Sequence, residues 1–90
     1  MLKIERSKIY KKDIRKQKFS DQHYARYVAY LGRLVEERAL PKEAYDHALA
    51  GDWNGYREFH ISGDVLIIYK IVGDTLYLAR IGSHSELFSK

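Results

Sequence analysis

Five side chains that can transfer protons or bind anions fall in the second half of the sequence. They are His47, His60, Asp64, Arg80 and His84. The chain has no cysteine, which excludes thiolate catalysis, disulfides and cysteine-based zinc sites. It also lacks a serine–histidine signature and a glycine-rich loop that could cradle a phosphate. Such a set suits the cleavage of RNA, because RNA carries its own nucleophile, the ribose 2′-hydroxyl.

Cleavage of this kind needs three groups. A base removes the proton of the 2′-hydroxyl, an acid protonates the departing 5′-oxygen, and a cation stabilises the charge that develops on the phosphate. Histidine and aspartate can make both proton transfers, and arginine can bind the phosphate. The reaction needs neither metal nor cofactor, and it yields a 2′,3′-cyclic phosphate and a 5′-hydroxyl.

Ordinary structural roles are open to the same residues. His60 could be a hydrogen-bonded surface residue, Asp64 could serve a turn, and Arg80 could pair with a carboxylate at a strand end. A metal site is a further alternative, although no short ligand-pair motif supports it. Its ligands would be His47, His60, Asp64 and His84.

The first half of the chain predicts a short strand and two helices. Residues 1–5 alternate, and Ser7 suits an N-cap for a basic amphipathic helix. Ser20 and Asp21 open a second segment, whose apolar residues recur with helical spacing. These residues are Tyr24, Tyr27, Val28, Leu31, Leu34 and Val35. The second helix should end before Pro41, and residues 39–55 should form a loop that carries His47.

The second half predicts strands, because the period changes to two from Tyr56 onward. In residues 56–62, Phe59 and His60 lie on opposite faces, so His60 should point away from the core. Asp64 begins the next strand (64–72), and after a Gly-Asp hairpin turn the last strand (75–81) is closed by Arg80 and His84.

These elements predict an α+β fold in a single domain of residues 1–90. Two N-terminal helices should pack on one face of a small, mainly antiparallel four-stranded sheet, in the order β-α-α-β-β-β. The other face of the sheet should be partly open, and function is expected there.

Positive charge is concentrated near the N-terminus. The chain has a formal net charge of +4, and residues 1–18 contain eight Lys or Arg against two Asp or Glu, a local charge of +6. Four cations share a stripe of the first predicted helix: Lys8, Lys11, Lys12 and Arg15. Such a patch suits a phosphate backbone, although membrane surfaces and acidic proteins attract the same charge, and a solvated helix face is the plain alternative. No segment resembles a signal peptide or membrane span, so a cytoplasmic protein is expected.

Longer motifs resemble the YafQ branch of the RelE/ParE toxin superfamily. They are YDHALAGDWNGYREFHISGDVLIIYKI, followed by LARIGSHSELF. That branch typically shows Asp-His-Pro-Leu, Gly-x-Trp-x-Gly-Tyr-Arg-x-x-His, an Asp opening a Leu-Ile-Tyr strand, and a final Arg-x-Gly-[Ser/Thr]-His-x-x-Leu-Phe. The resemblance implies a bacterial toxin that enters the ribosomal A site and cuts mRNA during translation. It further implies a cognate antitoxin, through which the complex would bind operator DNA, and no cofactor or membrane.

The resemblance also implies roles for individual residues. The family's active-site positions fall on His47, His60, Asp64, Arg80, His84 and Phe88. His84 would be the general acid and Arg80 the phosphate clamp, while the base stays open among His47, His60 and Asp64. Phe88 would stack on or orient a base, and the basic helix (Lys8, Lys11, Lys12 and Arg15) would contact ribosomal RNA.

Two positions depart from the family pattern. Ala48 replaces the usual proline, which should loosen the loop that carries His47. Asn54 stands where a basic residue is common, so one RNA contact should be missing.

Two other functions stay open at this point. Inhibition of DNA gyrase, as in the ParE branch, would not need the histidine and aspartate set. A non-catalytic nucleic-acid-binding module or a degenerate toxin would keep its activity when the histidines are replaced, and its affinity would follow the salt dependence of phosphate contacts.

Overall fold

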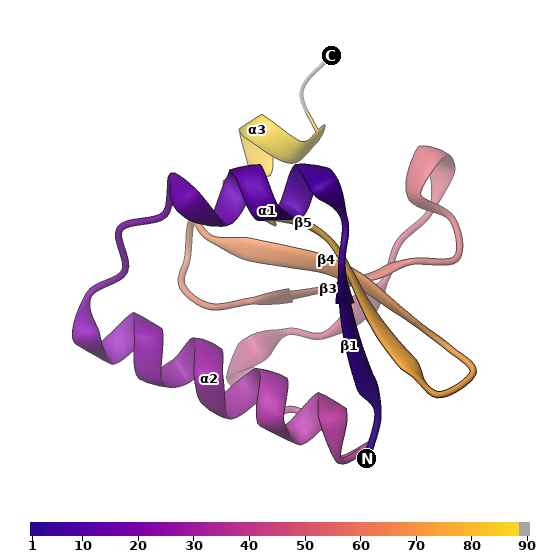
Figure 1. The fold of residues 1–90 in the computed structure, drawn as a ribbon. Coiled ribbons are helices and arrows are strands. Elements are labelled where there is room, and N and C mark those ends of the chain that lie inside the picture. The colour runs from indigo at the N-terminus through magenta and orange to yellow at the C-terminus, as the bar shows by residue number, and fades with distance from the viewer. Residues whose placement is uncertain (89–90) are drawn as a thin grey trace.

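The computed structural model describes residues 1–88, in which three α-helices surround a five-stranded mixed sheet (Figure 1). The strands are β1 (Lys3–Arg6), β2 (His47–Ala48), β3 (Arg57–His60), β4 (Leu66–Val72) and β5 (Thr75–Gly82). The helices are α1 (Lys8–Arg15), α2 (Asp21–Val35) and α3 (His84–Phe88), with the short 3-10 helices η1 (Lys42–Ala44) and η2 (Gly51–Trp53) on either side of β2. The strand order is β1-β5-β4-β3-β2, and β1 pairs in parallel with β5 while the other pairs are antiparallel. None of the helices in this part of the chain is long and apolar enough to cross a membrane.

The α+β class is confirmed, but the predicted four strands in the order β-α-α-β-β-β are wrong in two places. A fifth strand, β2, forms inside residues 39–55, which we expected to be a loop, and α3 follows the last strand. β2 has two residues and α3 has five. Neither is long enough to show a repeating pattern of apolar residues, which is the signal that sequence-based prediction uses.

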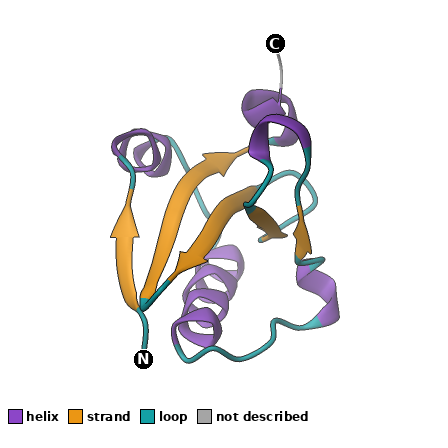
Figure 2. Ribbon diagram, turned by 90° about the vertical axis from the view of Figure 1, so that its right-hand side faces the viewer, coloured by secondary structure: helices purple, strands orange, loops and turns teal. Residues whose placement is uncertain are grey.

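Both N-terminal helices contribute to one core. Tyr10 of α1 and Tyr30 and Leu34 of α2 are buried against the sheet. Their partners on the strands are Phe59, Ile67, Tyr69, Leu76, Leu78 and Ile81, joined by Ile61 directly after β3. Figure 2 shows α2 seen nearly end-on beneath this face of the twisted sheet.

The opposite face of the sheet carries a smaller cluster. Leu66, Ile68 and Ala79 of the strands pack there with Leu87 of α3. Around them lie the partly buried residues Leu49, Trp53, Tyr56, Tyr77 and Phe88. This face, predicted to be partly open, is therefore covered at one end by α3 and by the segment around η2.

α1 lies along the edge of β5 where β1 ends. β1 pairs only with Thr75–Leu78. Beyond that point the Ser7 N–H donates to the Leu78 carbonyl oxygen at 3.0 Å and the Ser7 hydroxyl to that of Ala79 at 2.6 Å, while Asp13 accepts from the Ile81 N–H at 3.2 Å. Ser7 Oγ also accepts from the Tyr10 N–H at 2.8 Å, so the same side chain caps α1 and fixes it to β5.

Candidate active site

Glu58 joins two of the predicted site histidines into one cluster, the histidine centre (His47, Glu58 and His60). Glu58 lies opposite His47 in the β2–β3 pair, and His60 follows two residues later on the same face of β3. Glu58 Oε2 lies 3.1 Å from His47 Nε2 and 3.2 Å from His60 Nε2. The Glu58 side chain is only 6% exposed, against 36% for His47 and 24% for His60. The prediction that His60 points away from the core is confirmed, since its neighbour Phe59 is fully buried.

The hydrogen-bond partners of the ring nitrogens indicate where the protons lie. His47 Nδ1 lies 2.8 Å from the carbonyl oxygen of Tyr45, and its Nε2 faces the Glu58 carboxylate. Both partners can accept hydrogen bonds, so each ring nitrogen of His47 already faces an acceptor within the fold. In His60 only Nε2 has a partner, again Glu58, and within residues 1–88 its Nδ1 makes no hydrogen bond. Glu58 therefore orients a second ring that keeps one nitrogen free.

Two further features distinguish the surroundings of the histidine centre. Glu58 Oε1 is buried and forms no hydrogen bond with the described residues. Tyr45, whose ring centroid lies 4.5 Å from that of His47, has a φ of +49°, in the left-handed region that few non-glycine residues adopt. Strain of this sort gathers at functional sites, because only the surrounding structure can hold it in place.

The segment that carries His47 is held from its other side by Asp46. Asp46 Oδ1 accepts from the Tyr69 hydroxyl at 2.8 Å and from Arg57 Nε at 3.1 Å. Burial and the hydrogen bond to Asp46 raise the pKa of Tyr69, which keeps its hydroxyl a donor. These two contacts hold the segment beside Ala48 to the sheet, and the expectation that Ala48 loosens it stays a prediction.

A β-bulge in β5 sets the direction of Arg80. Ile68 pairs with Arg80 and Tyr69 pairs with Leu78, which leaves Ala79 as an extra residue. Without it, the alternation that buries Leu78 would also bury Arg80. The bulge instead buries Ile81 and leaves the Arg80 side chain 27% exposed.

Arg80 is bound by Asp13 of α1. Its Nε donates to Asp13 Oδ2 at 2.9 Å and its Nη2 donates to Oδ1 at 3.1 Å, a two-pronged ion pair. The hydrogen bond with Asp13 raises the pKa of Arg80, which stays charged. Its Nη1 makes no hydrogen bond within residues 1–88, so one prong of the guanidinium remains for another anion.

α3 presents His84 and Phe88 on one short helix. Ser83 caps it, since Ser83 Oγ accepts from the Glu86 N–H at 3.2 Å and Glu86 Oε1 accepts from the Ser83 N–H at 2.8 Å. The bonds with the Ser83 backbone and hydroxyl lower the pKa of Glu86. The ring centroids of His84 and Phe88 are 4.7 Å apart, and His84 is exposed. His84 therefore begins a helix, whereas we had expected it to close the last strand.

The register of the sheet brings these groups to one end of the molecule. His60 pairs with Leu66, which pairs with Gly82, and α3 begins two residues beyond Gly82. Asp64 lies at the same end, exposed on the turn between β3 and β4. The described residues show no hydrogen bond or ring contact between His84 and the histidine centre, and no three His, Asp or Glu side chains among them are disposed to hold a metal ion.

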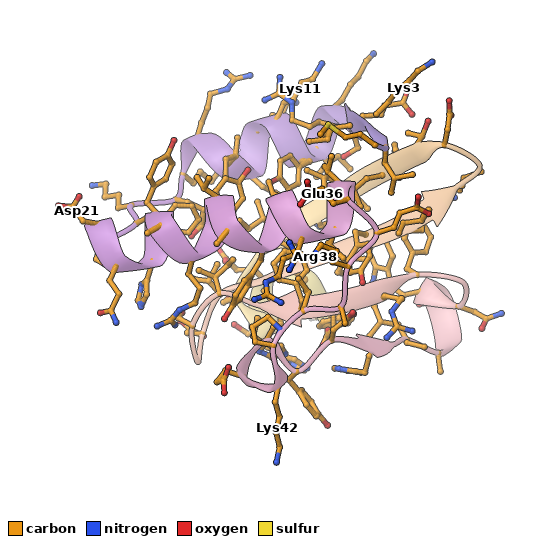
Figure 3. The ribbon with its side chains drawn as sticks, turned by 90° about the horizontal axis from the view of Figure 1, so that it is seen from below. Lys3, Lys11, Asp21, Glu36, Arg38 and Lys42 are labelled. Atoms are coloured by element: carbon orange, nitrogen blue, oxygen red, sulfur yellow. The ribbon has the colours of Figure 1, made fainter. Side chains whose placement is uncertain are left out.

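The four cations of the basic helix point away from the core. Lys8, Lys11, Lys12 and Arg15 are all exposed. Figure 3 shows Lys11 extending from α1 on the same side of the molecule as Lys3 of β1. Asp13 faces the sheet from the same helix, so α1 combines a cationic outer surface with an inner contact to Arg80.

Sequence reasoning missed two residues of the site, Glu58 and Asp13. Glu58 shares a strand face with His60, and that spacing of two residues could have indicated it. Asp13 stands among lysines on a basic helix, and only the packing of α1 against β5 gives it a partner. Arg80 and Asp13 are 67 residues apart, beyond the reach of any local pattern.

Relatives with known names match most of this chain. The putative toxin YafQ of Haemophilus influenzae is 38% identical over 66 residues, which are 69% of this chain and 65% of that protein, so the match spans just under two thirds of the relative's length. The mRNA interferase toxin YafQ of Escherichia coli K12 is 36% identical over 89 residues, covering 94% of each chain.

Solved structures show the same fold. A metal-bound toxin from Helicobacter pylori superposes with a TM-score of 0.86 at 39% identity, covering 98% of this chain and 100% of that one. The E. coli DinJ-YafQ complex contains a chain that superposes with a TM-score of 0.83 at 29% identity, covering 99% of this chain and 100% of that one. Residues 2–89 match the family described as the bacterial toxin of type II toxin-antitoxin system, YafQ. The chain therefore belongs to the YafQ family of type II toxin–antitoxin toxins.

Proposed function

We propose that this toxin is a ribosome-dependent endoribonuclease that cuts mRNA in the A site by metal-free acid–base attack of the ribose 2′-hydroxyl. The observation that carries the proposal is the geometry of the histidine centre, where Glu58 orients His60 and leaves its Nδ1 free. The exposed His84 lies at the same end of the sheet. The name of the E. coli relative, an mRNA interferase toxin, supports the activity.

His60 is the general base in this mechanism. A base needs a ring nitrogen without a proton that can reach the 2′-hydroxyl. The Nε2 of His60 donates to Glu58, which leaves the lone pair of Nδ1 for the substrate. His47 is less suited to this task, because both of its ring nitrogens already face acceptors within the fold. Its role is to share Glu58 with the base.

The reaction then runs through one displacement at phosphorus. The proton of the 2′-hydroxyl moves to His60 Nδ1 as the O2′–P bond forms, and His84 donates a proton to O5′ as the P–O5′ bond breaks. The products are a 2′,3′-cyclic phosphate and a 5′-hydroxyl, and both rings return to their starting states by proton exchange with water. Arg80 Nη1 stabilises the charge on the phosphate, and Phe88 packs a base beside His84.

Asp64 assists from the rim of this site. Its carboxylate makes no hydrogen bond within residues 1–88, and its backbone N–H donates to Ser62 Oγ at 3.3 Å. An exposed carboxylate on this turn can accept a hydrogen bond from a ribose or from a base edge of the bound codon. The ribosome would supply the in-line geometry that a free RNA chain seldom adopts.

The partners of this toxin follow from the same proposal. A cognate antitoxin would hold the toxin inactive, as the DinJ-YafQ complex of E. coli supports. The ribosome and mRNA would be its targets, and operator DNA would be bound only through the antitoxin complex. The basic helix α1 would contact ribosomal RNA with its exposed cations.

The test is primer extension on an mRNA translated in a reconstituted system. We expect the wild-type protein to cut within codons only when ribosomes are present, and His60→Ala and His84→Ala to lower the cleavage rate by about 100-fold or more. The fragments should accept a 5′-phosphate from a kinase without prior dephosphorylation, because cleavage leaves a 5′-hydroxyl.

His23→Ala is the matched control, since His23 lies on α2 outside the cluster and its backbone N–H only caps the helix. The proposal would be contradicted if the message stayed intact in the presence of the wild-type toxin. It would also be contradicted if both site variants cut the message at the wild-type rate. An intact message with inhibited gyrase would instead place this chain with toxins that act on gyrase.

A further inference from the structure

We infer that Tyr56, Lys70 and Tyr77 form a second RNA-binding subsite on the open part of the sheet. We call these three residues the tyrosine–lysine platform. The inference rests on the proposed function, and it adds to it a place where nucleotides of the same RNA strand bind away from the bond that is cut.

The platform is a row across two neighbouring strands and the residue that leads into a third. Lys70 of β4 pairs directly with Tyr77 of β5, and Tyr56 immediately precedes β3, whose first residue, Arg57, pairs with Tyr69. The Lys70 ammonium lies 4.7 Å from the ring centroid of Tyr56 and 5.6 Å from that of Tyr77. The backbone fixes Tyr56, since its N–H donates to Trp53 at 3.0 Å and its carbonyl accepts from Leu49 at 2.9 Å.

The row borders a shallow cavity of about 360 Å³. The remaining lining residues are Glu5, Val72 and Thr75. The volume falls at the lower end of the range for small-molecule pockets, and two half-buried tyrosine rings and one cation line it. Within the described residues Lys70 forms no ion pair, so its charge is held over the rings and available to an anion.

This combination matches the chemistry of a single-stranded nucleic acid. Bases stack on aromatic rings without regard to sequence, and a nearby ammonium binds the phosphate that links them. Trp53 extends the aromatic surface, because its ring centroid lies 5.1 Å from that of Tyr56. An apolar protein segment would bury such rings but would leave the Lys70 charge without a partner.

The platform shares one face of the sheet with the histidine centre. Glu58 and His60 share one face of β3, and Tyr56, one residue before the strand, packs with the apolar cluster of that face, four residues from His60. At about 3.3 Å per residue their separation along the strand is about 13 Å. One RNA strand of several nucleotides can therefore occupy both places, with Phe88 and His84 at the cleavage end and the two tyrosines at the other.

The test compares two RNA lengths in binding to the full chain that carries His84→Ala, which prevents cutting. By fluorescence anisotropy, we expect an octanucleotide to bind about 100-fold more tightly than a trinucleotide. Tyr56→Ala and Tyr77→Ala should each lower the affinity for the octanucleotide by about 10-fold, the effect of one lost stacking contact. Neither variant should change the affinity for the trinucleotide. Lys70→Met should reduce the slope of log affinity against log salt by about 0.7, the value for one phosphate of a single strand.

Tyr24→Ala and Lys42→Met are the matched controls, because both side chains are exposed on other elements. Glu5→Gln should tighten octanucleotide binding, since it removes the negative charge that lines the cavity.

An octanucleotide that binds no more tightly than the trinucleotide would overturn the inference, as would binding that the platform variants leave unchanged. If the platform variants instead bind RNA normally but no longer bind the antitoxin, this face of the sheet binds a protein partner. Cleavage that depends on His84 is measured separately, so the proposed function can hold when the platform fails.

Discussion

Arg80 reaches across from β5 to α1 and donates two hydrogen bonds to Asp13, at 2.9 and 3.1 Å. The Asp13 carboxylate also accepts from the backbone N–H of Ile81, so one buried side chain fixes both the guanidinium and the strand that bears it. In the proposed mechanism, Asp13 would hold Arg80 in position for a phosphate, as an orienting carboxylate holds a catalytic histidine.

The first prediction concerns this pair. Asp13→Asn should lower the cleavage rate by about 10-fold, because an amide can accept from Ile81 but no longer holds both prongs of Arg80 in place. It should lower the free energy of unfolding by about 1–3 kcal/mol, the usual effect of losing hydrogen bonds between charged groups. Reconstituted cleavage and chemical denaturation measure the two effects.

Asp21→Asn serves as its control, since Asp21 is an exposed carboxylate at the start of α2. If Asp13→Asn cuts at the wild-type rate while its stability falls, Asp13 only holds α1 to the sheet and does not position Arg80.

Glu58 gives the second prediction. Glu58→Gln keeps the shape of the side chain but removes the charge that both histidine rings face, so the proton on His60 is no longer confined to Nε2. We expect cleavage to fall by about 100-fold. Nitrogen NMR of the His60 ring should show the Nε2–H form in the wild type and a mixture of the two neutral forms in the variant. Equal ring spectra for the two proteins would refute this positioning role.

The third prediction tests the basic helix. Replacing Lys11, Lys12 and Arg15 together by Glu should abolish association with ribosomes in a sedimentation assay and leave the circular dichroism spectrum unchanged. These side chains are exposed and make no contact with the core, so the fold does not depend on their charge. Phosphate contacts also make association fall steeply as salt rises.

An equal charge change elsewhere provides the comparison for the basic helix. Arg33, Arg38 and Lys42 are exposed at the end of α2 and beyond it, and Figure 3 shows Arg38 and Lys42 well away from Lys11. Their joint replacement by Glu should reduce association far less. Equal losses in the two triple variants would show that net charge alone governs binding.

Much of the fold could be predicted because its longer elements have clear periods. The apolar spacing of Tyr27, Leu31 and Leu34 indicated α2, and the alternation around Phe59 indicated β3 and the outward position of His60. β2 could not be predicted, since two residues have no period and its place depends on Asp46 reaching Tyr69 and Arg57.

The sequence suggested residue types for the candidate site but not the contacts among them. The motifs indicated His47, His60, Arg80 and His84, whereas Glu58 and Asp13 acquire their roles only through contacts that the folded chain makes. The bulge at Ala79 was also missed, because a single inserted residue changes the direction of Arg80 without leaving a mark in the alternation of a strand that is apolar on both faces.

The last prediction concerns the cap of α3 and its dependence on pH. Ser83 binds the Glu86 carboxylate in the folded state and lowers its pKa from the usual value of 4.5. A lowered pKa means that the ionised form stabilises the fold, so this stabilisation is fully present above the usual pKa and disappears as the pH falls through the lowered value. Glu86→Gln keeps an oxygen that can accept from the Ser83 N–H but loses the charge beside the start of the helix.

At about pH 7 the Leu87 amide, which donates to the Ser83 carbonyl at 3.1 Å, should therefore exchange with solvent faster in Glu86→Gln than in the wild type. After correction for intrinsic exchange, the difference should disappear as the pH falls through the lowered pKa of Glu86, because both side chains are then neutral. Because α3 presents His84, the variant should also cut more slowly at neutral pH. A difference in exchange that persists unchanged in acid would mean that the Glu86 charge does not stabilise the cap.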